Sequence, residues 1–107
     1  MTRLEFTHNI CCLILEMQDM GERPIMDYVK RSDEEQKRLY DAGLSQCDGI
    51  NHISMHQIGR ACDIYFLSED GFHLVEPLWG YDHWHKQWEE QYGGHPSLNW
   101  DLGHFEV

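Results

Sequence analysis

Two histidines and an aspartate are the residues of this chain whose types and spacing could do chemistry. His56 and Asp63 stand at the entry to an alternating apolar run, and His104 stands near the end of the chain. Catalytic zinc sites take such imidazole and carboxylate ligands, often three with one position left open. An ionised carboxylate inside a strand is costly unless it is paired or bound to a metal. His56 and Asp63 alone favour a plain hydrogen bond, whereas adding His104 favours a divalent metal site.

Asp101 stands three residues before His104 and could supply a second kind of chemistry. In an ideal strand, residues three apart point to opposite faces. Gly103 lies between the two and could relax this geometry through a bulge or bend. Asp101 would then be a general base, close to the water that attacks a carbonyl. The alternative is that Asp101 is a solvated turn residue.

Two short motifs with fixed spacing carry a resemblance to a known family. They read Ser54-x-His56-x-x-Gly59-x-Ala61-x-Asp63 and, far downstream, Asp101-x-x-His104. Together they resemble the signature of the zinc-dependent LAS-type peptidases. These include the VanX/VanY D-alanyl-D-alanine carboxypeptidases and the L-alanyl-D-glutamate endopeptidases of phage endolysins. The resemblance runs from about Arg31 to Glu106, although the chain, at 107 residues, is shorter than most of these enzymes.

The resemblance implies a role for each matched residue. Zinc would be bound by His56, Asp63 and His104, with Asp101 as the catalytic base. The segment Arg31-Ser32-x-x-x-Gln36 also resembles the family, and there Arg31, Gln36 and Ser54 would contact the substrate peptide. A guanidinium suits this role because it grips a carboxylate with two hydrogen bonds. The alternatives are a surface position before a helix for Arg31 and an exposed helix position for Gln36.

The implied function is hydrolysis of an amide bond in the stem peptide of bacterial peptidoglycan. An aspartate at position 101 resembles the endolysin endopeptidases more closely than the D,D-peptidase branch, where glutamate is usual. We therefore expect an L-alanyl-D-glutamate endopeptidase. Two alternatives stay open: a D-alanyl-D-alanine carboxypeptidase, and a non-catalytic zinc-binding module of the same fold. The implied fold is α+β, with a small antiparallel sheet and flanking helices, in the hedgehog or D,D-peptidase-like class.

The chain pattern predicts the elements that must position these residues. Capping signals predict helices over 2–20 and from Ser32 to Gly43. Alternation predicts a strand over 60–66, with 72–75 as its hairpin partner and a short extended segment near 23–31. A further helix is expected over 78–92 and a last strand-like segment over 100–107. Helices together with antiparallel strands indicate an α+β fold, and the length indicates a single domain, 1–107.

Other chemistry-bearing residues have simpler interpretations. His83 and His85 form a rival metal motif, but positions two apart on a helix point in different directions. Trp84 and Trp88 fit the core face of the same helix. Glu106 shares a strand face with His104 and could orient it from behind.

The overall charge excludes some function classes. Eight basic and 19 acidic residues give a net charge of −11, which argues against a nucleic-acid binder and against attachment to an anionic membrane surface. The run Ile10–Met17 is too short to span a bilayer and lacks a signal-peptide cleavage site. We expect a monomer made in the cytoplasm without a signal peptide. It would act on the bacterial cell wall after a phage-type release.

Overall fold

Strand β2 (Ala61–Leu67) is the centre of an antiparallel sheet of four strands. The computed structural model describes residues 1–27, 32–45, 47, 55–56, 59–98 and 100–107. On one side β2 pairs with β1 (Pro24–Asp27). On its other side it pairs with β4 (His104–Glu106) near its start and with β3 (Leu74–Val75) near its end. The expected α+β class is confirmed.

Helices α1 (Arg3–Asp19) and α3 (Tyr81–Tyr92) cover one face of this sheet. Alternation along β2 sends Cys62, Ile64 and Phe66 into the core beneath them. Trp84 and Trp88 of α3 are fully buried there, as the helix pattern predicted. The opposite face of β2 therefore carries Asp63, and this is the face on which a site can form.

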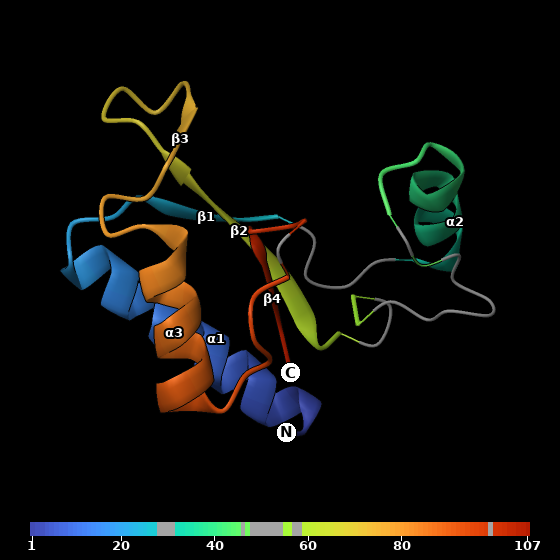
Figure 1. The fold of residues 1–107 in the computed structure, drawn as a ribbon, viewed down its shortest axis with the longest axis horizontal. Coiled ribbons are helices and arrows are strands. Elements are labelled where there is room, and N and C mark those ends of the chain that lie inside the picture. The colour runs from blue at the N-terminus through green and yellow to red at the C-terminus, as the bar shows by residue number, and fades with distance from the viewer. Residues whose placement is uncertain (28–31, 46, 48–54, 57–58, 99) are drawn as a thin grey trace.

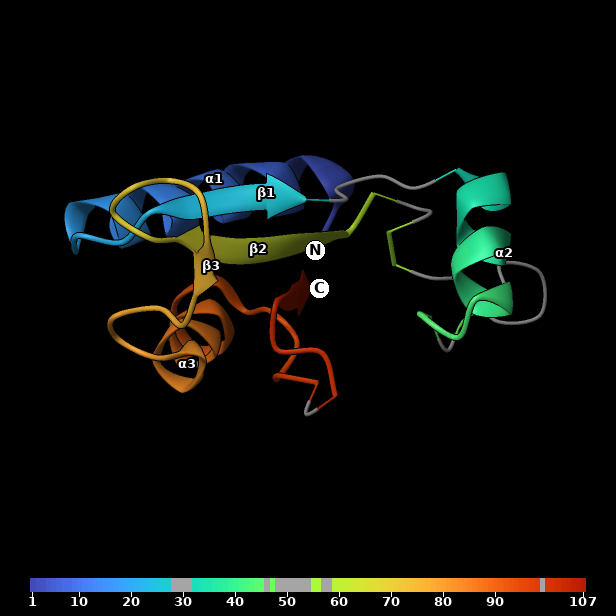
Figure 2. The same cartoon turned by 90° about the horizontal axis from the view of Figure 1, so that it is seen from above.

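Helix α2 (Asp33–Asp41) lies apart from the other two helices, beyond the point where β1 ends and β2 begins (Figures 1 and 2). Its start was predicted from a capping box, and the Ser32 side chain does accept a hydrogen bond from the Glu35 amide. Among the helices that the structure describes, none is both long and apolar enough to cross a membrane.

The buried carboxylate of Glu22 joins the start of β1 to the segment that leads into α3. It accepts hydrogen bonds from the backbone amides of Leu78 and Trp79 and from the indole Nε1 of Trp84, at 2.8, 3.2 and 2.6 Å. Glu22→Gln keeps the size but has a single acceptor oxygen. We expect Glu22→Gln to lower the free energy of unfolding, measured by urea denaturation, by about 2 kcal/mol.

The matched control is Glu90→Gln, the same chemical change at an exposed position of α3. It should leave the free energy of unfolding within a few tenths of a kcal/mol of the wild type. Equal stability of the two variants would contradict the bridging role of Glu22.

Candidate metal centre

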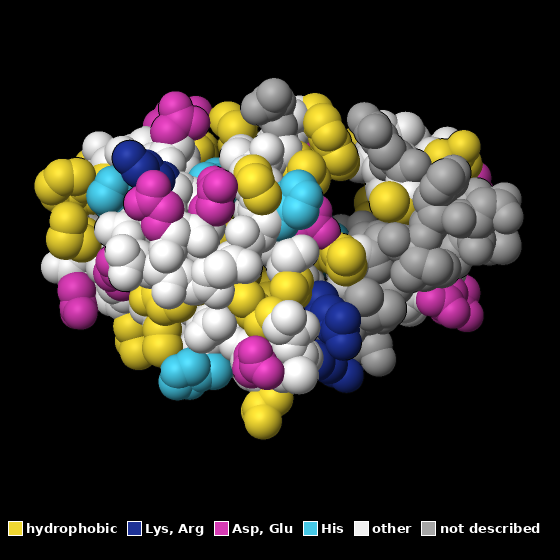
Figure 3. Space-filling view, turned by 60° about the horizontal axis from the view of Figure 1, so that its bottom comes forward, with side chains coloured by type: hydrophobic (Ala, Val, Ile, Leu, Met, Phe, Trp, Pro, Cys, Tyr) yellow, Lys and Arg dark blue, Asp and Glu magenta, His cyan; other side chains and the backbone are white. Residues whose placement is uncertain are grey.

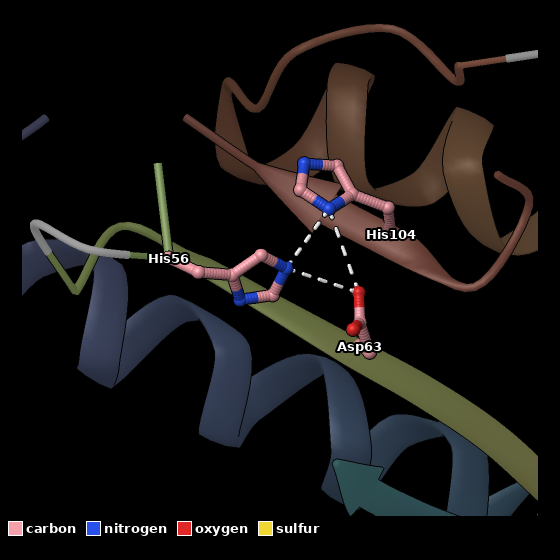
Figure 4. A group of neighbouring side chains, drawn as sticks. All are labelled: His56, Asp63 and His104. Atoms are coloured by element: carbon pink, nitrogen blue, oxygen red, sulfur yellow. Dashed lines mark hydrogen bonds and ion pairs between the residues drawn. The ribbon is translucent and has the colours of Figure 1, made fainter. Parts of the chain in front are cut away.

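His56, Asp63 and His104 lie together, although His104 is 48 residues beyond His56 in the sequence (Figure 4). Asp63 is in the middle of β2, and His104 is the first residue of β4. Strand pairing sets these two residues directly opposite each other, so their side chains share one face of the sheet. His56 precedes β2 and reaches the same point. The sequence predicted these three residues as one group, and the structure places them side by side.

The three side chains present their ligand atoms as a small triangle. His56 Nε2 lies 3.1 Å from Asp63 Oδ1 and 3.1 Å from His104 Nδ1, and the latter two atoms are 3.4 Å apart. Two ligand atoms on a tetrahedral zinc ion are about 3.3 Å apart, because each zinc–ligand bond is about 2.0 Å long. Two imidazoles and one carboxylate are also a donor set that zinc accepts. The residues present therefore fit a zinc ion.

Burial makes this arrangement electrostatically demanding. All three side chains are buried. Burial by itself would raise the pKa of Asp63, but hydrogen bonds with His104 and His56 lower it to about 2. Burial opposes protonation of His104, but hydrogen bonds with Asp63 and Glu106 raise its pKa to about 9. The carboxylate is thus ionised and stabilised by positive charge, which either a proton or a metal cation can supply.

Glu106 lies on the far side of the His104 ring from Asp63. Its Oε1 is 3.5 Å from His104 Nε2, and the hydrogen bond with His104 lowers the pKa of Glu106. A carboxylate behind the second ring nitrogen of a histidine fixes the ring orientation and increases its basicity. This placement agrees with the prediction that Glu106 orients His104.

A turn, not a bulge, connects Asp101 to His104. The backbone amide of His104 donates to the Asp101 carbonyl at 3.2 Å, and β4 begins only at His104. Gly103 is needed in this turn because a Cβ there would lie 2.7 Å from the Tyr65 ring. Because Asp101 lies before β4, its side chain does not have to point to the opposite face from His104, as it would in a continuous strand.

Asp101 lines two hollows that adjoin the metal cluster. The first has a volume of about 310 Å³, and the second about 320 Å³. The first also includes the side of the cluster formed by His56, His104 and Glu106, and the second includes Asp27, Asp63 and Tyr65. Figure 3 shows a hollow on this side of the molecule, with histidine and acidic side chains at its edge. Leu44, Trp100 and Asp101 line both hollows, so the two hollows lie next to each other beside the cluster, and we refer to them together as the groove.

Tyr65 is a groove residue that the sequence interpretation left without a role. Burial, followed by the charges of Asp63 and Asp101, raises its pKa to about 12. Its hydroxyl therefore keeps its proton and can act as a hydrogen-bond donor in an otherwise acidic groove. The signal was present in the sequence, because alternation places Tyr65 on the same face of β2 as Asp63.

Of the three predicted substrate-binding residues, the structure describes one, Gln36. Gln36 is fully buried, and its Nε2 donates to Ser45 Oγ at 2.7 Å and to the Cys47 carbonyl at 2.5 Å. It holds the loop whose Ser45 and Cys47 line the first hollow, so it is not an exposed helix position. Its contact with substrate stays a prediction. Arg31 and Ser54 lie outside the described residues.

The rival metal motif on α3 does not form a site. His83 lies between the rings of Trp79 and Trp84, whereas His85 is buried and hydrogen-bonded to the Leu102 carbonyl. Within the part of the chain that the structure describes, His56, Asp63 and His104 are the one cluster suited to a metal ion.

Comparisons with known proteins bear on the fold. No family model matches the sequence, and no curated protein matches it. Among solved structures, the chain is similar to the crystal structure of an L,D-carboxypeptidase DacB from Streptococcus pneumonia, with a TM-score of 0.64 and 22% sequence identity. The match covers 96% of this chain and 64% of the carboxypeptidase, so this chain spans slightly less than two thirds of that protein. At this identity, the similarity shows a shared fold.

Proposed function

We propose that residues 1–107 form one zinc-dependent peptidase domain that hydrolyses an amide bond in the stem peptide of bacterial peptidoglycan. The observation that carries the proposal is the buried triangle of His56, Asp63 and His104, with Asp101 in the adjoining groove. The similarity of the fold to that of an L,D-carboxypeptidase supports it.

The roles in the reaction follow from the chemistry of each group. Bound zinc supplies Lewis acidity, which polarises a carbonyl and makes water nucleophilic near neutral pH. Asp101 accepts the proton of the attacking water and passes it to the leaving amine. Glu106 keeps the His104 ring in place, and Arg31 and Ser54 hold the peptide. Gln36 supports the peptide site from beneath, because its buried amide holds the loop that carries Ser45 and Cys47.

Two bonds are candidates for cleavage. Asp101, in the position where the D,D-peptidase branch usually has glutamate, favours an L-alanyl-D-glutamate endopeptidase of the endolysin type. The L,D-carboxypeptidase with the similar fold favours a carboxypeptidase as the second candidate. Two hollows adjoin the cluster, one at His56 and His104 and the other at Asp63. This arrangement suits an endopeptidase, because substrate residues must lie on both sides of the cleaved bond.

Digestion of purified muropeptides by the zinc-loaded protein, followed by mass analysis of the fragments, tests the proposal. An endopeptidase releases a fragment that begins with D-glutamate, whereas a carboxypeptidase releases a single terminal amino acid. We expect the first result. One zinc ion per chain with no cleavage of any wall preparation would instead identify a non-catalytic zinc module.

A further inference from the structure

The buried ring of His85 lies against the turn that separates Asp101 from His104. His85 projects from α3, and its Nε2 is 2.5 Å from the Leu102 carbonyl oxygen. Leu102 is in the middle of that turn, before the pairing of β4 with β2 begins. A side chain from a distant helix thus bonds to the backbone between the expected base and the expected ligand.

The direction of this hydrogen bond follows from its partner. A carbonyl oxygen only accepts, so Nε2 must carry the hydrogen and donate it. Nδ1 is buried and has no hydrogen-bond partner among the described residues, which fits a neutral ring with a single N–H. Burial lowers the pKa of His85 and so supports this neutral form at physiological pH.

The same ring also contacts the residue that follows the ligand. His85 stacks on Phe105, with ring centroids 4.1 Å apart and the planes within 3° of parallel. Phe105 is in the core, with its ring on the opposite face of β4 from His104. His85 therefore fixes the backbone before His104 by a hydrogen bond and the side chain after it by stacking.

We infer that His85 is a positioning residue, which holds the turn over 101–104 in the shape that presents His104 to zinc and Asp101 to the groove. This inference rests on the proposed function. Other backbone contacts shape the turn: the Ile64 amide donates to the Gly103 carbonyl at 2.7 Å, and the Asp101 amide donates to the Leu98 carbonyl at 3.0 Å. His85 adds a contact from α3, which ties the turn to the buried core.

The test compares the zinc dissociation constants of two variants, measured by competition with a chromophoric chelator. His85→Phe keeps a stacking ring but removes the donor, and we expect it to weaken zinc binding about tenfold, as for other groups that orient metal ligands. His85→Gln places an amide N–H where Nε2 was, and its dissociation constant should stay close to that of the wild type.

The matched control is Trp84→Phe, a change at the residue that precedes His85 on α3. This change removes a buried hydrogen bond, from Trp84 Nε1 to Glu22, in which no residue of the turn takes part. It should lower the free energy of unfolding without changing zinc affinity. If His85→Phe does not fold, His85→Asn replaces it, since its shorter amide cannot reach Leu102 and should likewise bind zinc more weakly than His85→Gln.

Equal zinc affinity in the wild type and His85→Phe, or in the Gln and Asn variants, would overturn the positioning role. The same holds if Trp84→Phe weakens zinc binding as much as His85→Phe does. Failure of the proposed function has a different signature: the wild type binds zinc and yet cleaves no muropeptide, while the ranking of the His85 variants persists. A wild type that binds no zinc would reject both.

Discussion

Asp101→Asn is expected to remove nearly all hydrolysis of the stem peptide while leaving the zinc content unchanged. The amide matches the carboxylate in size but cannot accept a proton. A positioned general base contributes about 10²–10⁴-fold to a rate, so kcat should fall within that range. The zinc content should persist because Asp101 is not one of the three residues whose ligand atoms form the triangle. Turnover of muropeptides and metal analysis of the same sample measure the two effects.

Asp27→Asn provides the matched control for this prediction. Asp27 lines the second hollow together with Asp101 and is paired directly across the sheet with Asp63. Its replacement removes one negative charge from the same groove without removing the proposed base. We expect a much smaller fall in kcat than for Asp101→Asn. If kcat falls equally in the two variants, Asp101 acts only through its negative charge in the groove, and its assigned role as a base is wrong.

Helices α1 and α2 were predictable because their signals are local. Thr2 and Ser32 each accept a hydrogen bond from the amide three residues later, at 3.1 Å, as their capping boxes predicted. The prediction of the hairpin was less accurate, since β3 begins at Leu74 and not at Phe72. The reason is the preceding turn, in which the Asp70 carboxylate accepts a hydrogen bond from the Phe72 amide and so keeps it out of the strand.

The site was predictable in its residue types but not in its geometry. The periodicity of β2 places Asp63 on one face, but it says nothing about which strand lies alongside. The pairing of Asp63 with His104 is a long-range contact, which residue types and the motif resemblance suggested but no periodicity predicts. The groove could not be predicted from the sequence either, because Leu44 and Trp100 come from loops that no periodic pattern governs.

Gln36 shows the limit of reasoning from a single helix. Helix α2 is strongly polar, and by its own sequence Gln36 has no reason to be buried. It is buried because the loop after α2 folds back over it and supplies Ser45 and Cys47 as acceptors. Helix periodicity describes one element, whereas burial depends on what packs against that element.

The second large effect concerns the stability that zinc confers. Zinc that binds only the folded chain should stabilise it by about 4 kcal/mol when the free zinc concentration is a thousand times the dissociation constant. In His104→Ala the triangle keeps two of its three ligands, and the Glu106 carboxylate loses its partner. We expect the variant to lose most of the zinc-dependent rise in Tm that the wild type shows in thermal unfolding followed by circular dichroism.

The decisive quantity is the zinc-induced change within each variant, not the stability of the metal-free protein. His104 is buried beside Phe105 in a short strand, so its truncation also lowers the stability of the metal-free fold. That loss is present with and without zinc and cancels in the difference. His73→Ala is the matched control, because His73 is exposed on the turn before β3 and pairs with Asp70 at 3.9 Å. Its zinc-induced rise in Tm should equal that of the wild type. An equal rise in His104→Ala would place the bound zinc elsewhere, and a wild type whose Tm does not respond to zinc would reduce the cluster to a hydrogen-bonded His–Asp–His group.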